Sequence, residues 1–231
     1  MAREKKADAT GSLGKPKEKA SPKAKMAAIP KMNIREFELV LVGDSPLVSH
    51  AWSKKAKQMM LDKQMKRPKA AKEAKNPAQD VIASLYWMSP KPKTADLDAL
   101  KTGKFGFPTI AFKAAAVDAC SYVDGITKVA ARGSFHIEAE LLPIEGQPRQ
   151  REDMVRIAMG RADIRYRGEF PVDVENGVTW RVRVPIRYNA SVISEAQITH
   201  LFAVAGFSVG IGEHRPQHNG SWGMFHVEQD S

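Results

Sequence analysis

The stretch GIGEHRPQHNGSWGMFHV, residues 210–227, gathers the side chains of this chain that are best suited to chemistry. It contains four glycines, one arginine, three histidines and a tryptophan. Arginine and histidine donate hydrogen bonds to anions, tryptophan offers a stacking surface, and glycine lets another backbone approach closely. This composition suits a phosphate cradle, a metal site or a nucleic-acid contact, and equally a sharp turn between two elements.

Nucleotide-binding loops of known spacing are excluded for this stretch. A dinucleotide fingerprint places G-x-G-x-x-G between a strand and a helix, so that the pyrophosphate meets a helix N-terminus. Here Gly210 and Gly212 follow a predicted helix and precede a predicted strand, and Arg215 stands in place of the third glycine. The stretch also lacks the G-K-[ST] of a Walker loop.

A metal site or other cofactor is not predicted for these histidines. His214 and His218 would share a face only on a helix, and Asn219 and Gly220 disfavour a helix there. Outside the stretch, the chain offers a single cysteine, Cys120, as a soft metal ligand. The histidines are therefore weighed as hydrogen-bond donors.

Cysteine content and hydropathy bear on the compartment. With one cysteine no intrachain disulfide can form, so a reducing, cytoplasmic location is expected. No apolar run approaches the roughly 20 residues that cross a membrane. The sequence therefore predicts a protein without a membrane partner.

The net charge of +10 is concentrated in two segments. Residues 1–32 hold nine Lys or Arg and three Asp or Glu, with almost no large apolar residue, which predicts a disordered basic arm. Such an arm either binds polyanions loosely or keeps the protein in solution. Residues 53–75 hold nine Lys or Arg and two Asp or Glu, and their apolar residues follow helical spacing as far as Pro68. They predict either a solvated basic helix or a contact to nucleic-acid backbone.

The remaining chain predicts an α+β fold. Alternating hydrophobicity marks four strands, over residues 33–43, 133–146, 177–189 and 221–228. One helix is expected from a cap at Thr109 to about Val123, and a second from the N-cap Ser194 to Gly206, placed just past its end. Residues 88–106 are expected to form a loop.

The resulting order is β-α-β-β-α-β, a ferredoxin-like or RRM-like core. Residues 43–108 and 146–170 are predicted insertions within a single domain that covers residues 33–231. The second insertion is Arg-rich and is expected to form a loop or hairpin that could act as a flexible thumb on phosphates.

Two motifs resemble those of a known family. The segment GIGEHRPQHNGSWGMF resembles the C-terminal glycine-rich loop of the repeat-associated mysterious proteins, the RAMP superfamily of CRISPR effector complexes. FPTIAFKAAAVDA is similar to the family's entry into its first helix, with Lys113 as the basic residue just inside. The resemblance is greatest to the backbone subunits, and it extends to uncharacterised phage and prophage proteins. It implies an RRM-like or ferredoxin-like fold that polymerises along RNA, and no catalytic residue of the family finds a match.

The residues predicted to contact nucleic acid come from several parts of the chain. In the third strand, arginines alternate with apolar residues and face away from the helices, although a cross-strand ladder with glutamates is the alternative. Trp222 is either a stacking surface or part of the core. The full set is Lys113, Arg132, Arg149, Arg151, Arg161, Arg165, Arg167, Arg181, Arg183, Gly210, Gly212, His214, Arg215, Gly220, Trp222 and Gly223.

The sequence favours a non-catalytic protein that binds RNA or single-stranded DNA and forms a homo-oligomer or filament along it. Two other classes stay open. One is a phage structural or assembly protein whose basic arm touches packaged nucleic acid. The other is a metal-independent endoribonuclease of the RAMP type, which would use His214 or His136.

Overall fold

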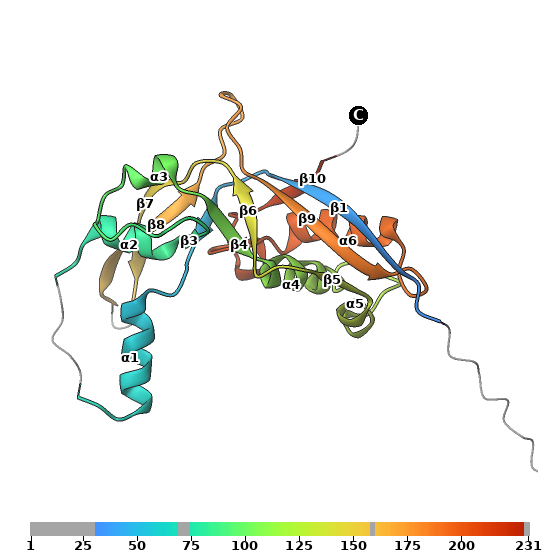
Figure 1. Cartoon of the computed structure of the whole chain (residues 1–231), viewed down its shortest axis with the longest axis horizontal. Helices are drawn as coiled ribbons and strands as arrows, with labels where there is room; N and C mark the ends of the chain where they lie inside the picture. The colour runs from blue at the N-terminus through green and yellow to red at the C-terminus, as the bar shows by residue number, and fades with distance from the viewer. Residues whose placement is uncertain (1–30, 69–73, 158–159, 229–231) are drawn as a thin grey trace, which may run out of the picture. The chain divides into compact units, whose positions relative to one another are not determined.

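Two antiparallel sheets organise the computed structural model, which describes residues 31–68, 74–157 and 160–228 (Figure 1). The larger sheet has the strand order β10-β1-β9-β6-β4-β3, and β5 also pairs with β9. The smaller sheet has the order β2-β8-β7. The fold is therefore mixed α+β, as the sequence predicts. The predicted arm, residues 1–32, lies outside the described residues except for Lys31 and Met32.

The strands are short except where they pair along the centre of each sheet. Their bounds are β1 Ile34–Gly43, β2 Leu47–Ser49, β3 Tyr86–Trp87, β4 Phe105–Pro108, β5 Phe135–Ile137, β6 Leu141–Glu145, β7 Arg149–Arg156, β8 Ala162–Phe170, β9 Arg181–Asn189 and β10 Phe225–Val227. The helices are α1 Lys54–Gln64, α2 Pro77–Ser84, α3 Ala99–Thr102, α4 Thr109–Ala119, α5 Lys128–Ser134, α6 Glu195–Ser208 and the 3₁₀ turn η2 Pro216–His218.

Strand β9 shows why the larger sheet forms. Its residues alternate between exposed and buried, and Val182, Val184 and Ile186 point into the core. The helices α4 and α6 contact one another and cover this apolar face. Because the smaller sheet contributes Leu47 and Phe170 to the same cluster, both sheets share one hydrophobic core.

The second predicted strand, residues 133–146, is interrupted. Ile137 pairs with Ile186 and Ile144 with Val182, so seven steps along this segment match four along β9. The three extra residues form a bulge at Ala139, whose φ is 150°. Because three is an odd number of residues, the alternation of faces is reversed after the bulge. The buried side chains are therefore at the odd-numbered Phe135 before it and at the even-numbered Leu142 and Ile144 after it.

Several predicted boundaries are wrong for local reasons. Thr109 is the first residue of α4 rather than its cap, and its hydroxyl donates to the carbonyl of Ala139 at 2.7 Å. The same helix ends at Ala119, short of Val123. The expected loop over residues 88–106 contains helix α3 and the start of β4.

Gly206 lies inside α6 rather than beyond its end. A Cβ at this position would lie 1.8 Å from the carbonyl oxygen of Phe225 in β10. The glycine therefore permits a close crossing of helix and strand. The predicted N-cap is correct, since Ser194 and Gln197 form a complete capping box.

The arginine-rich insertion is predicted to be a loop or a hairpin, and it is a hairpin. Strands β7 and β8 pair over their whole length, and β8 also pairs with β2. One face of this smaller sheet meets α2, where Gly168 packs on Leu85. The other face carries the arginines, and it meets the loop between α6 and β10.

Candidate nucleic-acid interface

The glycine-rich loop, residues 209–224, is a compact turn fixed by its own backbone. Ile211 N donates to Gly223 O at 3.0 Å, and Trp222 N donates to His214 O at 3.1 Å. Gly223 has a φ of 65°, and a Cβ there would lie 1.8 Å from the carbonyl oxygen of Ile211. The loop's own folding thus requires the glycine.

Arg215 is engaged within this loop. Its Nε and Nη2 donate to Gln217 Oε1 at 3.2 and 3.0 Å, and its Nη1 donates to the carbonyl of Gly212 at 3.3 Å. Gln217 in turn donates to Asp118 of α4 at 2.8 Å. Hydrogen bonds from Lys128 and Gln217 lower the pKa of the Asp118 carboxyl. This network ties the loop to the helical layer, and the guanidinium of Arg215 already has partners in the chain.

Trp222 joins the loop to the β7–β8 hairpin. The guanidinium of Arg151 lies 3.8 Å from the centre of the indole, which is a cation–π contact. On the same indole, the ring of His214 packs edge-on at a centroid distance of 4.8 Å. His214 adopts a left-handed backbone with a φ of 50°, which is uncommon for a residue with a Cβ. Trp222 is half-buried, but the described hydrophobic core does not include it, and its predicted role as a stacking surface stays a prediction.

Glu169 of β8 holds the arginines from beneath. Its side chain is 1% exposed and accepts hydrogen bonds from Arg149 Nε at 2.9 Å and from Arg151 Nη1. Arg151 Nε also donates to Asp153 at 2.9 Å. Burial lowers the pKa of Arg151, but the hydrogen bonds to Asp153 and Glu169 outweigh it and raise that pKa. A buried carboxylate with two cationic partners fixes where both guanidinium groups lie.

A second polar group, centred on Glu213, lies at the same junction. His50, which follows β2, hydrogen-bonds through Nδ1 to Glu213 Oε1. Arg167 of β8 places its Nη2 3.3 Å from His50 Nε2 and its Nε 3.4 Å from Glu213 Oε2. The Nε of Arg167 is buried and makes no hydrogen bond within the described part of the chain. Burial raises the pKa of Glu213, but the hydrogen bond from His50 and the charges of Arg167 and His214 lower it overall.

We call these residues together the Trp222 surface. Among them His50, Arg149 and His214 are exposed to solvent. The members are His50, Arg149, Arg151, Arg167, Glu169, Glu213, His214 and Trp222. Sequence reasoning found the arginines, His214 and Trp222, but it missed His50, Glu169 and Glu213.

The tip of the hairpin carries the remaining predicted arginines of this insertion. Arg165 pairs across the hairpin with Asp153 and is half-buried. Arg161 is exposed, and its carbonyl accepts a hydrogen bond from Ile157 N at 2.8 Å. These side chains extend the basic character of the hairpin toward its turn.

The arginines of β9 lie on the sheet face that α4 and α6 do not cover. Arg183 lies 3.4 Å from both Glu38 and Glu145, and Arg181 lies 3.4 Å from Glu228. The neighbouring Arg187 is also paired, to Glu138 at 2.7 Å. These distances agree with the predicted alternative of a cross-strand ladder. Since the ladder joins three arginines to five glutamates, it adds no positive charge to the open face.

Lys113 of α4 contacts Arg132 near the end of α5, and both residues are distant in sequence from the glycine-rich loop. The ammonium of Lys113 donates to the carbonyls of Arg132 and Phe135 at 2.9 and 2.7 Å, where α5 ends. Burial lowers the pKa of Lys113. Arg132 itself is exposed. In this structure Lys113 therefore acts as a cap of α5.

The two histidines considered for ribonuclease chemistry lie in different groups. His136 Nδ1 is 3.2 Å from the ammonium of Lys113, and His214 packs on Trp222. Within residues 31–68, 74–157 and 160–228, no three His, Cys, Asp or Glu side chains are grouped as a metal ion would need. No helix in the same part of the chain is long and apolar enough to cross a membrane.

Comparison with known proteins gives no family for this chain. A scan against protein-family models finds no match, and a search of curated proteins finds no match either. The geometry of the Trp222 surface is therefore the main evidence for function.

Proposed function

We propose that this protein binds RNA or single-stranded DNA without cleaving it, through the Trp222 surface. The observation that carries the proposal is the stack of Arg151 on Trp222 beside the exposed side chains of Arg149, His50 and His214. An indole with cationic and imidazole donors around it offers both parts of single-strand recognition, stacking for bases and charge-assisted hydrogen bonds for phosphates.

The buried Glu169 and the partly buried Glu213 support this reading because they fix the donors in advance. Glu169 holds Arg149 and Arg151, and Glu213 holds His50 beside Arg167. Donors that are held in place lose little rotamer freedom when a phosphate arrives.

The strand order supports a ferredoxin-like core for this proposal. The order β10-β1-β9-β5 places the last strand beside the first, and α4 and α6 lie in the connections that follow β1 and β9. With the two sequence motifs, this order is the basis for proposing kinship with the RAMP superfamily and with its phage-encoded forms. We also propose a cytoplasmic location, since Cys120 is a buried free thiol.

The test is the binding of 30-nucleotide RNA and DNA single strands, followed by fluorescence anisotropy at several salt concentrations. Arg149→Gln should weaken binding and lower the salt slope by about 1, because one phosphate contact is lost. Arg35→Gln is the matched control, since Arg35 is exposed on β1 and outside the Trp222 surface. Equal effects of both variants would overturn the assignment of this surface.

The alternatives give different results in the same assay. Cleavage of the RNA without added metal would favour an endoribonuclease, and loss of cleavage in His214→Ala or His136→Ala would identify the histidine. Absence of binding to every strand would favour a structural or assembly protein.

A further inference from the structure

Helix α1 lacks the tertiary support that the other long helices have. None of its residues is buried, although Ser53 caps its N-terminus. Figure 1 shows α1 extending away from both sheets. An isolated helix of 11 residues is only marginally stable in water, so α1 would gain stability by packing against another surface.

The surface of α1 is both apolar and basic. Met59 is 65% exposed, and Met60, Leu61 and Met65 are between 44% and 53% exposed. Residues 52–67 hold six Lys or Arg and one Asp. Exposed methionines next to lysines are the chemistry of a helix that docks into an apolar groove with an acidic rim.

Helix α6 offers such a groove on its solvent side. Ala196, His200, Ala203 and Phe207 are spaced by four, three and four residues, so they form one stripe along the helix. Phe207 is 73% exposed. The two alanines leave room for a second helix to approach closely.

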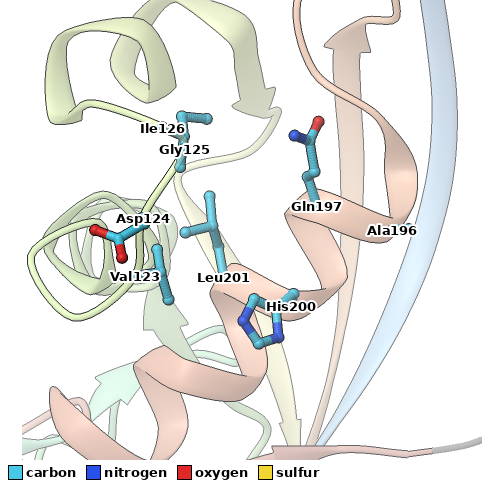
Figure 2. Close-up of a pocket in the computed structure, with 8 residues that line it drawn as sticks. All are labelled: Val123, Asp124, Gly125, Ile126, Ala196, Gln197, His200 and Leu201. Carbon is cyan, nitrogen blue, oxygen red and sulfur yellow. The ribbon is translucent and has the colours of Figure 1, made fainter.

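A hollow lies on each side of this stripe. On one side, a hollow of about 480 Å³ separates α6 from residues 123–126, and Figure 2 shows Val123, Ile126, His200 and Leu201 gathered around it. On the other side, a groove of about 1140 Å³ runs between α6 and the edge formed by β1 and β10. Phe37, Leu39 and Val227 are among its apolar lining.

The charges around these hollows are opposite to those of α1. Acidic residues line both hollows: Glu195, Glu38 and Glu228 in the groove, and Asp124 in the smaller hollow. Glu38 and Glu228 also lie 3.4 Å from Arg183 and Arg181, so the acidic charge that α1 would meet comes mainly from Glu195 and Asp124. No Lys or Arg is among the lining residues of either hollow. We define the α6 face as the stripe together with these two hollows.

We propose that helix α1 of one copy of this protein docks on the α6 face of the next copy. Four exposed apolar residues of α1 would fill hollows lined by apolar side chains, and its basic residues would meet the acidic rim. The donor and the acceptor are different surfaces of one chain, so the contact is head to tail. A head-to-tail contact repeats without closing unless the rotation happens to form a ring. This inference supplies a contact for the oligomer that the sequence predicts, and it depends on the proposed strand binding only for what the oligomer would be used for.

Two variants separate the donor from the acceptor. Met59→Asp with Met60→Asp places charge on α1, and Ala203→Arg places a bulky cation in the middle of the α6 stripe. Both changes are at exposed positions, so circular dichroism and the Tm should stay close to those of the wild type. Val174→Asp, at an exposed apolar position in the turn before β9, is the matched control.

Light scattering without nucleic acid then gives the test. The wild type and Val174→Asp should grow in mass as concentration rises, and each docking variant alone should stay at the mass of one chain. An equal mixture of the two docking variants should form a complex of two chains and no larger, because one intact donor meets one intact acceptor. A wild type that stays a monomer, or a mixture without dimers, would overturn the inference.

The same proteins distinguish this failure from failure of the proposed function. The donor variant keeps the Trp222 surface, so it should still bind a single strand, one copy at a time. Dimers in the mixture without any strand binding would leave the docking in place and refute the nucleic-acid proposal. Strand binding without dimers would do the reverse.

Discussion

Arginine and glutamate meet in two regions of this molecule, at the Trp222 surface and on the open face of the larger sheet. At the Trp222 surface the central carboxylate, Glu169, is 1% exposed and has two guanidinium partners. On the open face Glu38 and Arg183 are 50% and 60% exposed and 3.4 Å apart. The same two residue types thus form a buried anchor in one region and a hydrated ladder in the other.

This difference in burial indicates where an arginine side chain is available for a ligand. Arg149 is anchored by the buried Glu169 and is still 65% exposed, so part of its guanidinium stays accessible to a ligand. A ladder guanidinium has acidic neighbours on the same exposed face, and these repel a phosphate. Site prediction from arginine spacing treats both regions alike, although only the first combines donors with a stacking indole.

The anchor should respond most strongly. Glu169→Gln should lower the free energy of unfolding by about 3 kcal/mol, because Arg149 and Arg151 would both lose their shared buried partner and Arg151 would keep only Asp153. Urea denaturation measures the change. In the ladder, Glu38→Gln should cost less than about 0.5 kcal/mol, because exposed pairs contribute little. Similar losses for both variants would remove the distinction between the two regions.

The next effect concerns the indole. Trp222→Ala should weaken binding of a single strand by about 1–3 kcal/mol for each base that stacks there. Anisotropy with RNA and DNA strands measures it at a temperature where the variant is folded. Tyr122→Ala is a suitable control, since Tyr122 is 56% exposed and lies outside the Trp222 surface. Unchanged affinity in the Trp222 variant would leave the indole only its packing on Arg151 and His214.

A smaller effect depends on pH through Glu213. Its pKa lies below the ordinary value of 4.5, so the ionised carboxylate stabilises the fold. This stability is fully present above pH 4.5 and is lost as the pH falls through the lowered pKa. Glu213→Gln should therefore be less stable than the wild type at neutral pH, and the difference should shrink in acid. A difference that stays constant down to pH 3 would contradict this assignment.

The smallest effect is expected in the ladder. Arg183→Gln should leave the free energy of unfolding close to that of the wild type, since its partners Glu38 and Glu145 are 50% and 56% exposed and exposed pairs contribute little. Its effect on strand binding should also be small beside that of Arg149→Gln. A larger loss of affinity for Arg183→Gln would move the binding surface to the open sheet.

Strand β9 and the capped start of α6 were predictable from the sequence because their signals are local. Alternation of apolar residues marks β9, and Ser194 with Gln197 marks the helix start. The bulge at Ala139 was not predictable, because the shift of register depends on pairing with β9. Likewise, the glycine at position 206 predicts a helix end, because its contact with Phe225 is not visible in the sequence.

The candidate site was only half predictable, for a related reason. Trp222, His214 and the hairpin arginines stand out by type. His50 and Arg167 are 117 residues apart and meet only because β2 pairs with β8. Nothing in the short segment LVS, residues 47–49, indicates that partner. Buried acids such as Glu169 are also hidden in a sequence, since glutamate is expected on the surface.

The crossing of α6 over β10 at Gly206 has an evolutionary consequence. Any side chain there would meet the Phe225 carbonyl and push the helix outward, and this helix leads directly into the glycine-rich loop. In related genes, position 206 should therefore stay glycine while exposed residues outside the Trp222 surface vary. Where a lineage does replace this glycine, the glycine-rich loop and Trp222 should change with it. The residue at position 206 would then indicate whether a lineage retains the Trp222 surface.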